Sequence, residues 1–243
     1  MEAEPIGAAE VAALPLRTQL VLMKTVAHSL KILHDLRIVH SDLKPSNILL
    51  KRTELGLTTK LIDFDSSYTA GDPPPPDTIV GTIDYYSPEM LGYIQEDGVP
   101  ASALGVASDV FALGLIYTEY LTGAKPPFDP SFHEPAVAVR SGVTLRIPPA
   151  GALPALVALV DRMLAADPAA RPTIAEVHAA LMAIPLPPDG VSAAISPSAP
   201  SALRGKGLRT ARRPHVPATP TAGAGPSRLV GKLLGRLSER GRS

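Results

Sequence analysis

Two short stretches decide how this chain folds: HSDLKPSN at residues 40–47 and DFD at residues 63–65. Between them they carry a carboxylate, an ammonium group, an amide and a second carboxylate in a fixed order: Asp42, Lys44, Asn47 and Asp63. Phosphoryl transfer asks a protein for positioning and charge neutralisation rather than for covalent chemistry. A base for the acceptor hydroxyl, a cation for the phosphate and two oxygen ligands for Mg²⁺ form the minimal set. The spacing therefore indicates phosphoryl transfer.

Two further motifs follow along the chain, GTIDYYSPE at residues 81–89 and SDVFALG at residues 108–114. A single triplet such as DFD recurs by chance, but four motifs in this order fix one topology. Together they resemble the C-terminal lobe of a eukaryotic-type Ser/Thr protein kinase, over residues 5–185. The resemblance implies a protein kinase-like fold with the C-lobe only (residues 1–185), mainly helical with a small β-hairpin, followed by a disordered C-terminal tail.

The resemblance implies a role for each residue that carries this chemistry. Asp42 would be the catalytic base, and Lys44 would bind and neutralise the transferred phosphate of ATP, with Ser or Thr as the acceptor. Asn47 and Asp63 would bind Mg²⁺, which prefers oxygen ligands, and Leu49 would form the floor of the adenine slot. Taken singly, such residues are more often turns, caps or surface hydrogen-bonding groups. Only their joint spacing carries the assignment.

Six further residues would have structural roles under the resemblance: His40, Phe64, Thr82, Glu89, Asp109 and Arg171. In the activation segment (residues 63–89), Thr82 is expected near Asp42. Glu89 is expected to form a buried ion pair with Arg171, which ties the activation segment to the late helices.

The remaining structural residues would position the catalytic loop (residues 38–47). Asp109 lies at the start of a predicted buried helix and would anchor the backbone of that loop. His40 and Phe64 would stack as the lower part of a hydrophobic spine. None of these residues performs chemistry under the resemblance, and each positions a group that does.

Three features depart from the family pattern. Ser41 stands where many kinases have an arginine that grips an activation-loop phosphate, and a serine cannot form a bidentate guanidinium contact. This predicts that phosphorylation does not control the protein through that pocket. Asp65 replaces a glycine, which adds charge and restricts the backbone, and its effect is open between metal binding and slower loop movement. The connection from Glu89 to Asp109 is about eight residues longer than usual, as surface loops tolerate.

Apolar spacing predicts the elements that carry the motifs. Residues 15–35 follow a 3.6-residue period and are predicted to form the helix before the catalytic loop. Residues 48–50 and 60–62 are predicted to form a hairpin that brings Asn47 and Asp63 together. Helices are also predicted at three later places: 110–121, 153–164 and 173–181, the last with a Thr173–Glu176 capping box.

Charge divides the chain, because residues 1–185 have a net charge of −8 and residues 186–243 one of +8. Residues 186–226 are rich in Pro, Ala, Ser and Gly and are predicted to be a disordered linker. Residues 227–243 place Leu and Val at helical spacing opposite Arg and Lys, which is typical of a short basic amphipathic helix. Contact of this tail with nucleic acid or an anionic membrane is one hypothesis. No aromatic residue interleaves the cations, so composition favours a solvated tail.

Composition excludes several classes of protein. The 243 residues contain no cysteine, which excludes disulfides, thiolate metal sites and a cysteine nucleophile. The first ten residues are acidic where a secretory signal needs cations, and no apolar run approaches the ~18 residues of a membrane-spanning helix. We therefore expect a globular protein with no transmembrane segment and a cytoplasmic location.

The sequence contains no GxGxxG stretch and no VAIK-like string, with which a complete kinase holds the ATP phosphates. The resemblance thus implies an N-lobe-less or truncated catalytic domain, in which either a partner or the missing N-lobe covers the exposed apolar face. Two functions remain open: an ATP-dependent Ser/Thr protein kinase that acts on a protein hydroxyl, and a non-catalytic kinase-like binding or scaffold module. Retention of the whole phosphoryl-transfer set argues for the enzyme, since a scaffold needs none of it.

Overall fold

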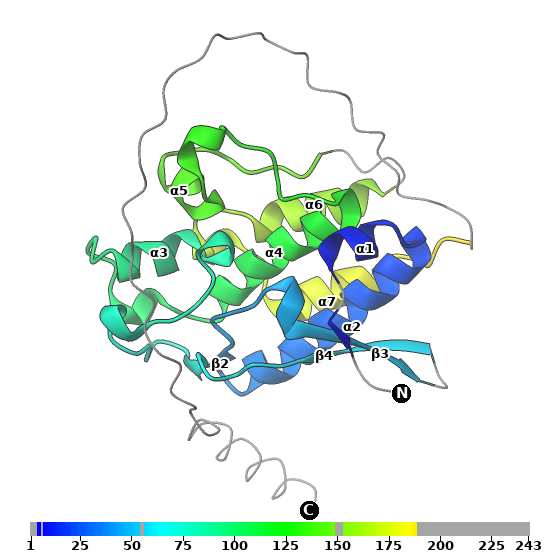
Figure 1. The fold of residues 1–243 in the computed structure, drawn as a ribbon, viewed down its shortest axis with the longest axis horizontal. Coiled ribbons are helices and arrows are strands. Elements are labelled where there is room, and N and C mark those ends of the chain that lie inside the picture. Colours follow the sequence, from blue (N-terminus) through cyan, green and yellow to red (C-terminus); the bar gives the residue numbers. More distant parts are fainter. Residues whose placement is uncertain (1–3, 6, 54–55, 149–152, 189–243) are drawn as a thin grey trace, which may run out of the picture. The chain divides into compact units, whose positions relative to one another are not determined.

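The computed structural model describes residues 4–5, 7–53, 56–148 and 153–188, which form a mostly helical domain with two small antiparallel sheets (Figure 1). The helices are α1 (Ala8–Ala12), α2 (Leu16–Asp35), α3 (Pro88–Ile94), α4 (Ala107–Thr122), α5 (Pro135–Arg140), α6 (Pro154–Met163) and α7 (Ile174–Ala183). The strands are β1 (Glu4–Pro5), β2 (Ile38–Val39), β3 (Ile48–Thr53), β4 (Gly56–Leu61) and β5 (Tyr68–Thr69). The prediction of a mainly helical fold is confirmed.

The long helix α2 forms the platform for the catalytic loop. It begins directly after Pro15, and its apolar face packs against β4, α4 and α7, as the apolar period predicts. Leu20, Met23 and Leu30 on this face are fully buried. The Tyr117 hydroxyl of α4 donates a hydrogen bond to the Met23 carbonyl at 2.6 Å. Burying each such apolar side chain contributes about 1.5–3 kcal/mol, so α2 is firmly held beneath the loop that follows it.

The predicted hairpin is confirmed, and its strands β3 and β4 are longer than the short apolar runs that predicted it. The two strands pair in an antiparallel register that places Ile48 opposite Leu61. One residue earlier, the Asn47 carbonyl accepts a hydrogen bond from the Ile62 amide at 3.0 Å. Asn47 and Asp63 therefore lie at the same end of the hairpin.

Helix α4 is the central helix of the domain, and nearly all of its side chains are buried. It ends at Gly123, whose φ of +80° is a left-handed conformation that glycine adopts without steric cost. At Gly114, a Cβ atom would lie 3.0 Å from Leu164 Cδ2 and 3.1 Å from Met163 Cβ. The missing side chain therefore allows α6 to approach the backbone of α4.

Helices α6 and α7 lie close to their predicted ranges, whereas α3 and α5 were not predicted. The capping box of α7 is present: the Glu176 amide donates to Thr173 Oγ1 at 3.2 Å, and the Thr173 amide donates to Glu176 Oε2 at 2.7 Å. Helices α3 and α5 have only seven and six residues. That length is too short for an apolar period to stand out, although Pro88 and Pro135 mark their first turns.

Part of the sequence prediction falls outside the described residues. The basic tail (227–243) and the linker from residue 189 onward belong to this part. No helix in the described part of the chain is long and apolar enough to cross a bilayer. The cytoplasmic location stays a prediction.

Candidate active site

The catalytic loop (residues 38–47) is fixed to α4 by one carboxylate. Asp109 is buried at the start of α4 and accepts hydrogen bonds from the His40 amide at 2.8 Å and the Ser41 amide at 3.1 Å. Ser41 has a φ of +73°, a left-handed conformation that is unfavourable for a residue with a side chain. The two hydrogen bonds offset that cost and set the direction in which the chain reaches Asp42.

His34 contacts the same carboxylate and is not among the residues predicted from the sequence. Its Nε2 lies 3.0 Å from Asp109 Oδ2, and the two side chains are only 4% and 2% exposed. Because a carboxylate only accepts hydrogen bonds, Nε2 of His34 carries the proton. His34 thus joins α2 to α4 beneath the catalytic loop. The one sequence signal was a histidine within an otherwise apolar helix stripe.

The Asp42 carboxylate is the meeting point of the catalytic loop and the activation segment. Its Oδ1 accepts hydrogen bonds from Thr82 N at 3.0 Å and Thr82 Oγ1 at 2.9 Å. Its Oδ2 accepts from Lys44 Nζ at 2.7 Å and from Asn47 Nδ2 at 3.2 Å. Asp42 is only 9% exposed. Four donors use all the lone-pair positions of the two oxygens, so the carboxylate has one fixed orientation.

Lys44 lies between this carboxylate and solvent. Its Nζ also donates to Thr82 Oγ1 at 2.9 Å, and its side chain is 25% exposed. An ammonium group has three donors, so one N–H has no partner among the described residues. A cavity of about 590 Å³ opens beside Lys44; its lining comprises Gly7, Ala8, Lys44, Pro45, Ser46, Thr82 and Tyr85. The ammonium group can therefore meet an anion that enters from this side.

Asn47 and Asp63 have the chemistry of Mg²⁺ ligands. Asn47 is 4% exposed and donates both N–H groups to Asp42, to its carbonyl at 2.8 Å and its Oδ2 at 3.2 Å. Its amide oxygen then has no donor in the described part of the chain, and the exposed Asp63 carboxylate has none there either. Mg²⁺ typically keeps several waters and binds one or two carboxylates together with substrate phosphates, which this donor set fits. The described ranges contain no group of three His, Cys, Asp or Glu residues that could hold a metal ion by themselves.

The DFD motif begins in a left-handed conformation, with a φ of +63° at Asp63. The rings of Phe64 and His40 lie 5.0 Å apart between their centroids, and His40 Nε2 is 3.0 Å from the Ile62 carbonyl. These contacts hold both ends of the Asp63 backbone. Asp65 is exposed and does not adopt a positive φ, so the absence of glycine at this position causes no backbone strain.

The activation segment is tied to the late helices by a buried bidentate ion pair. Arg171 donates to Glu89 Oε1 at 2.7 Å and to Glu89 Oε2 at 2.8 Å, with side chains 0% and 7% exposed. Ser108 Oγ donates to the same Oε1 at 2.9 Å, and Arg171 Nε donates to the Ala165 carbonyl at 2.8 Å. This desolvated pair is well satisfied by hydrogen bonds, which a buried charge requires.

Leu49, the predicted adenine floor, lies in the middle strand of the first sheet. Its Cα pairs with Pro5 of β1 on one side and with Lys60 of β4 on the other. The side chain is half-buried. Its contact with adenine stays a prediction.

A family model described as a protein kinase domain matches residues 10–181. The chain belongs to the protein kinase family. Its curated relatives include Ser/Thr protein kinases from bacteria and eukaryotes, so the resemblance to the eukaryotic-type Ser/Thr kinases is confirmed.

Three relatives illustrate how far this kinase resembles others. Serine/threonine-protein kinases drp72 of Corynebacterium efficiens is 33% identical over 222 residues, which cover 86% of this chain and 40% of that protein. An Aurora kinase of Yarrowia lipolytica is 33% identical over 153 residues, which cover 63% of this chain and 38% of that protein. A calcium and calcium/calmodulin-dependent serine/threonine-protein kinase of Lilium longiflorum is 34% identical over 121 residues, which cover 50% of this chain and 22% of that protein. The matched part is thus less than half of each relative.

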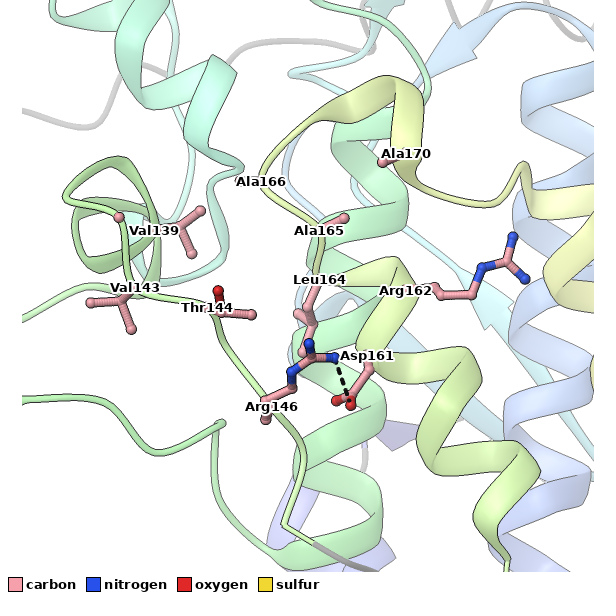
Figure 2. Close-up of a pocket in the computed structure, with 11 residues that line it drawn as sticks. Val139, Val143, Thr144, Arg146, Asp161, Arg162, Leu164, Ala165, Ala166 and Ala170 are labelled. Carbon is pink, nitrogen blue, oxygen red and sulfur yellow. Dashed lines mark hydrogen bonds and ion pairs between the residues drawn. The ribbon is translucent and has the colours of Figure 1, made fainter.

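The kinase domain has a second hollow, of about 410 Å³, between the loop that follows α5 and the end of α6 (Figure 2). Arg146 and Asp161 meet across it, with Arg146 Nη1 donating to Asp161 Oδ2 at 3.1 Å. Asp161 Oδ1 also accepts from the Ile147 amide at 2.9 Å. None of the residues predicted for phosphoryl transfer lines this hollow, so it lies apart from the candidate active site.

Proposed function

We propose that this kinase chain transfers the γ-phosphate of ATP to a Ser or Thr hydroxyl of a protein. The observation that carries the proposal is the set of four donors on the Asp42 carboxylate. Two of these donors, Lys44 and Asn47, are the residues to which the kinase resemblance assigns phosphate and Mg²⁺ binding, and the Lys44 side chain is 25% exposed beside a cavity. The names of two of the relatives above, from Corynebacterium efficiens and Lilium longiflorum, describe serine/threonine-protein kinases and support the same activity.

Asp42 accepts the proton of the attacking hydroxyl in this proposal. Since its lone-pair positions are all used, an incoming hydroxyl must replace one donor. Lys44 is the donor most free to leave, because its side chain is long and 25% exposed, whereas Thr82 N is backbone and Asn47 is buried. The substrate hydroxyl therefore takes the place of Lys44 at Oδ2.

The exchange at Oδ2 also delivers a cation to the phosphate. As Lys44 Nζ leaves Asp42, it donates to an oxygen of the γ-phosphate and neutralises part of its charge. The hydroxyl oxygen forms a bond to the γ-phosphorus, the bond from that phosphorus to the β–γ bridging oxygen breaks, and ADP leaves. The proton of the hydroxyl passes to Asp42. Thr82 keeps the carboxylate in place throughout, since both of its donors are on Oδ1.

Asn47 and Asp63 would hold Mg²⁺, which would neutralise charge on the phosphate oxygens of ATP. The role of the two residues is to present one amide oxygen and one carboxylate at the same end of the β3–β4 hairpin. Asn47 also orients Asp42, because both of its N–H groups are used on that residue.

We infer in addition that the described residues form the C-terminal lobe of a kinase. They provide the base, the cation and the metal ligands, but neither a GxGxxG loop nor a strand lysine in a VAIK-like string. Contacts that cover the adenine above Leu49 and hold the α- and β-phosphates then come from residues outside these 243, on the same polypeptide or on a partner.

The proposal is tested by Mg²⁺-dependent transfer of labelled γ-phosphate to a mixture of Ser- and Thr-containing peptides. Asp42→Asn is expected to lower the rate about 10²- to 10⁴-fold, because it removes the general base. Asp129→Asn is the matched control, since Asp129 is exposed and is held by hydrogen bonds from Ser131 alone among the described residues. Equal transfer by the wild-type chain and Asp42→Asn would contradict catalysis and favour the scaffold function.

A further inference from the structure

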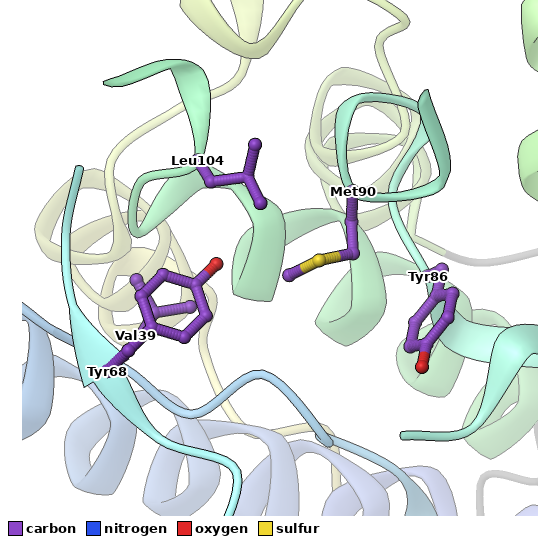
Figure 3. Close-up of a cluster of buried hydrophobic side chains, with 5 residues drawn as sticks. All are labelled: Val39, Tyr68, Tyr86, Met90 and Leu104. Carbon is purple, nitrogen blue, oxygen red and sulfur yellow. The ribbon is translucent and has the colours of Figure 1, made fainter. Parts of the chain in front are cut away.

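An apolar cluster holds the activation segment against the rest of the domain. It consists of five buried side chains, which converge from separate parts of the chain (Figure 3). We call this set the segment cluster; its members are Val39, Tyr68, Tyr86, Met90 and Leu104. Val39 of β2 directly precedes His40 in the catalytic loop. Tyr68 of β5 pairs with Val39. The cluster thus joins the activation segment to the catalytic loop.

Leu104 reaches this cluster from the long connection between α3 and α4. Its side chain is 0% exposed, and Val99 and Val106 from the same connection also pack on the cluster. The backbone takes part as well, since the Gly71 amide of the activation segment donates to the Leu104 carbonyl at 2.8 Å. This connection therefore supplies an apolar side chain and a hydrogen-bond acceptor to the activation segment.

The surroundings of the segment cluster do not suit an added phosphate. Ser41 has no charge, and two arginines near Met90 of the cluster are already paired, Arg171 with Glu89 and Arg140 with Asp97. Lys125 is the sole Lys or Arg in the sequence between Lys60 and Arg140. Lys125 is already bound to Asp84, with Nζ 3.0 Å from Oδ2. Burial raises the pKa of the Tyr68 hydroxyl, and the negative charges of Asp109 and Glu89 raise it further. New negative charge at this cluster is therefore unfavourable.

We propose that residues 95–106 are a positioning element, in which Leu104 closes the segment cluster and so holds the activation segment in place without phosphorylation. Apolar burial in this cluster would fix the activation segment, as contacts between a phosphate group and cations would otherwise do. The effect on catalysis rests on the proposed kinase function. The effect on the order of the activation segment does not, and it can be measured separately.

Hydrogen–deuterium exchange of the full chain tests the positioning role. Leu104→Ala is compared with Leu181→Ala, because both leucines are 0% exposed and Leu181 lies in α7. We expect amides of residues 66–80, including Gly71, to exchange at least about tenfold faster in Leu104→Ala, while α2 keeps its protection. Leu104→Ile, which keeps the volume, should restore slow exchange. Unchanged exchange in Leu104→Ala, or the same acceleration in both alanine variants, would overturn the proposal.

Phosphoryl transfer tests the catalytic consequence. We expect Leu104→Ala to lower kcat at least about tenfold at unchanged KM for ATP, and phosphatase treatment of the wild-type chain to leave its activity intact. Loss of activity on phosphatase treatment would overturn independence from phosphorylation. A wild-type chain that transfers no phosphate would contradict the proposed function, while the exchange experiment would still decide the role of Leu104.

Discussion

The catalytic loop and the activation segment meet at Asp42, yet the start of the loop and the middle of the segment are held by opposite kinds of interaction. The loop is fixed by the buried Asp109 carboxylate, which three donors contact. The activation segment rests on the segment cluster around Leu104, where the Tyr68 hydroxyl is buried and finds no partner among the described residues. A polar network fixes directions but is sensitive to the loss of one member, whereas an apolar cluster tolerates changes that keep its volume. The position of the catalytic base Asp42 is thus fixed precisely, whereas the activation segment beside it tolerates substitutions that keep the volume.

The ion pair between Glu89 and Arg171 should give the largest effect, because it is buried and ties the end of the activation segment to the late helices. Arg171→Ala leaves the Glu89 carboxylate buried without its partner, and we expect a loss of about 3–5 kcal/mol in the free energy of unfolding. Urea denaturation measures it. Arg171→Lys keeps the charge but loses the bidentate contact, so it should recover only part of the loss. A loss no larger than that of Arg162→Ala, on the exposed side of α6, would show that the pair does not hold the end of the activation segment.

His34→Leu tests the polar network that fixes the catalytic loop. This change removes a buried donor from Asp109, and hydrogen bonds to charged groups are worth about 1.5–3 kcal/mol. We expect kcat for phosphoryl transfer to fall at least about tenfold, at unchanged KM for ATP. His34→Gln restores an N–H donor and should restore most of kcat. If His34→Gln and His34→Leu are equally impaired, packing rather than the hydrogen bond is the role of His34.

Tyr68→Phe tests the segment cluster. We expect it to change the free energy of unfolding least, and in the opposite direction to Arg171→Ala. Removing a buried hydroxyl without a partner removes a desolvation cost of about 1–3 kcal/mol, so the variant should be as stable as the wild type or more stable. Thermal and urea unfolding both measure this change in stability. A clear loss of stability would mean that the hydroxyl has a partner, and that the segment cluster depends on a polar contact after all.

The sequence predicted the parts of this fold that are governed by local pattern. Helices α2 and α4 carry long apolar stripes, and the capping box of α7 is written in adjacent residues. Helices α3 and α5 were missed because they are too short for a period. The pairing of β2 with β5 was missed for another reason, since each strand has two residues and the pair exists only through tertiary contact.

The same distinction holds for the candidate site. The residues that would perform chemistry were predicted because their motifs fix both type and spacing. The roles of His34 and Leu104 could not be predicted, because each depends on a neighbour far along the chain. His34 acts on Asp109, 75 residues away. Leu104 belongs to one buried cluster with Tyr68 and Val39, which no local pattern connects with it.

Gly114 limits which sequences can carry this architecture. The space for its side chain is occupied by Leu164 and Met163 at the end of α6. The residues directly after α6 include Ala165, whose carbonyl receives Arg171. Adding one methyl group at position 114 would push on the segment that presents this carbonyl, far from any catalytic atom. We therefore expect a library randomised at position 114 to return glycine, even when the selection is for stability alone.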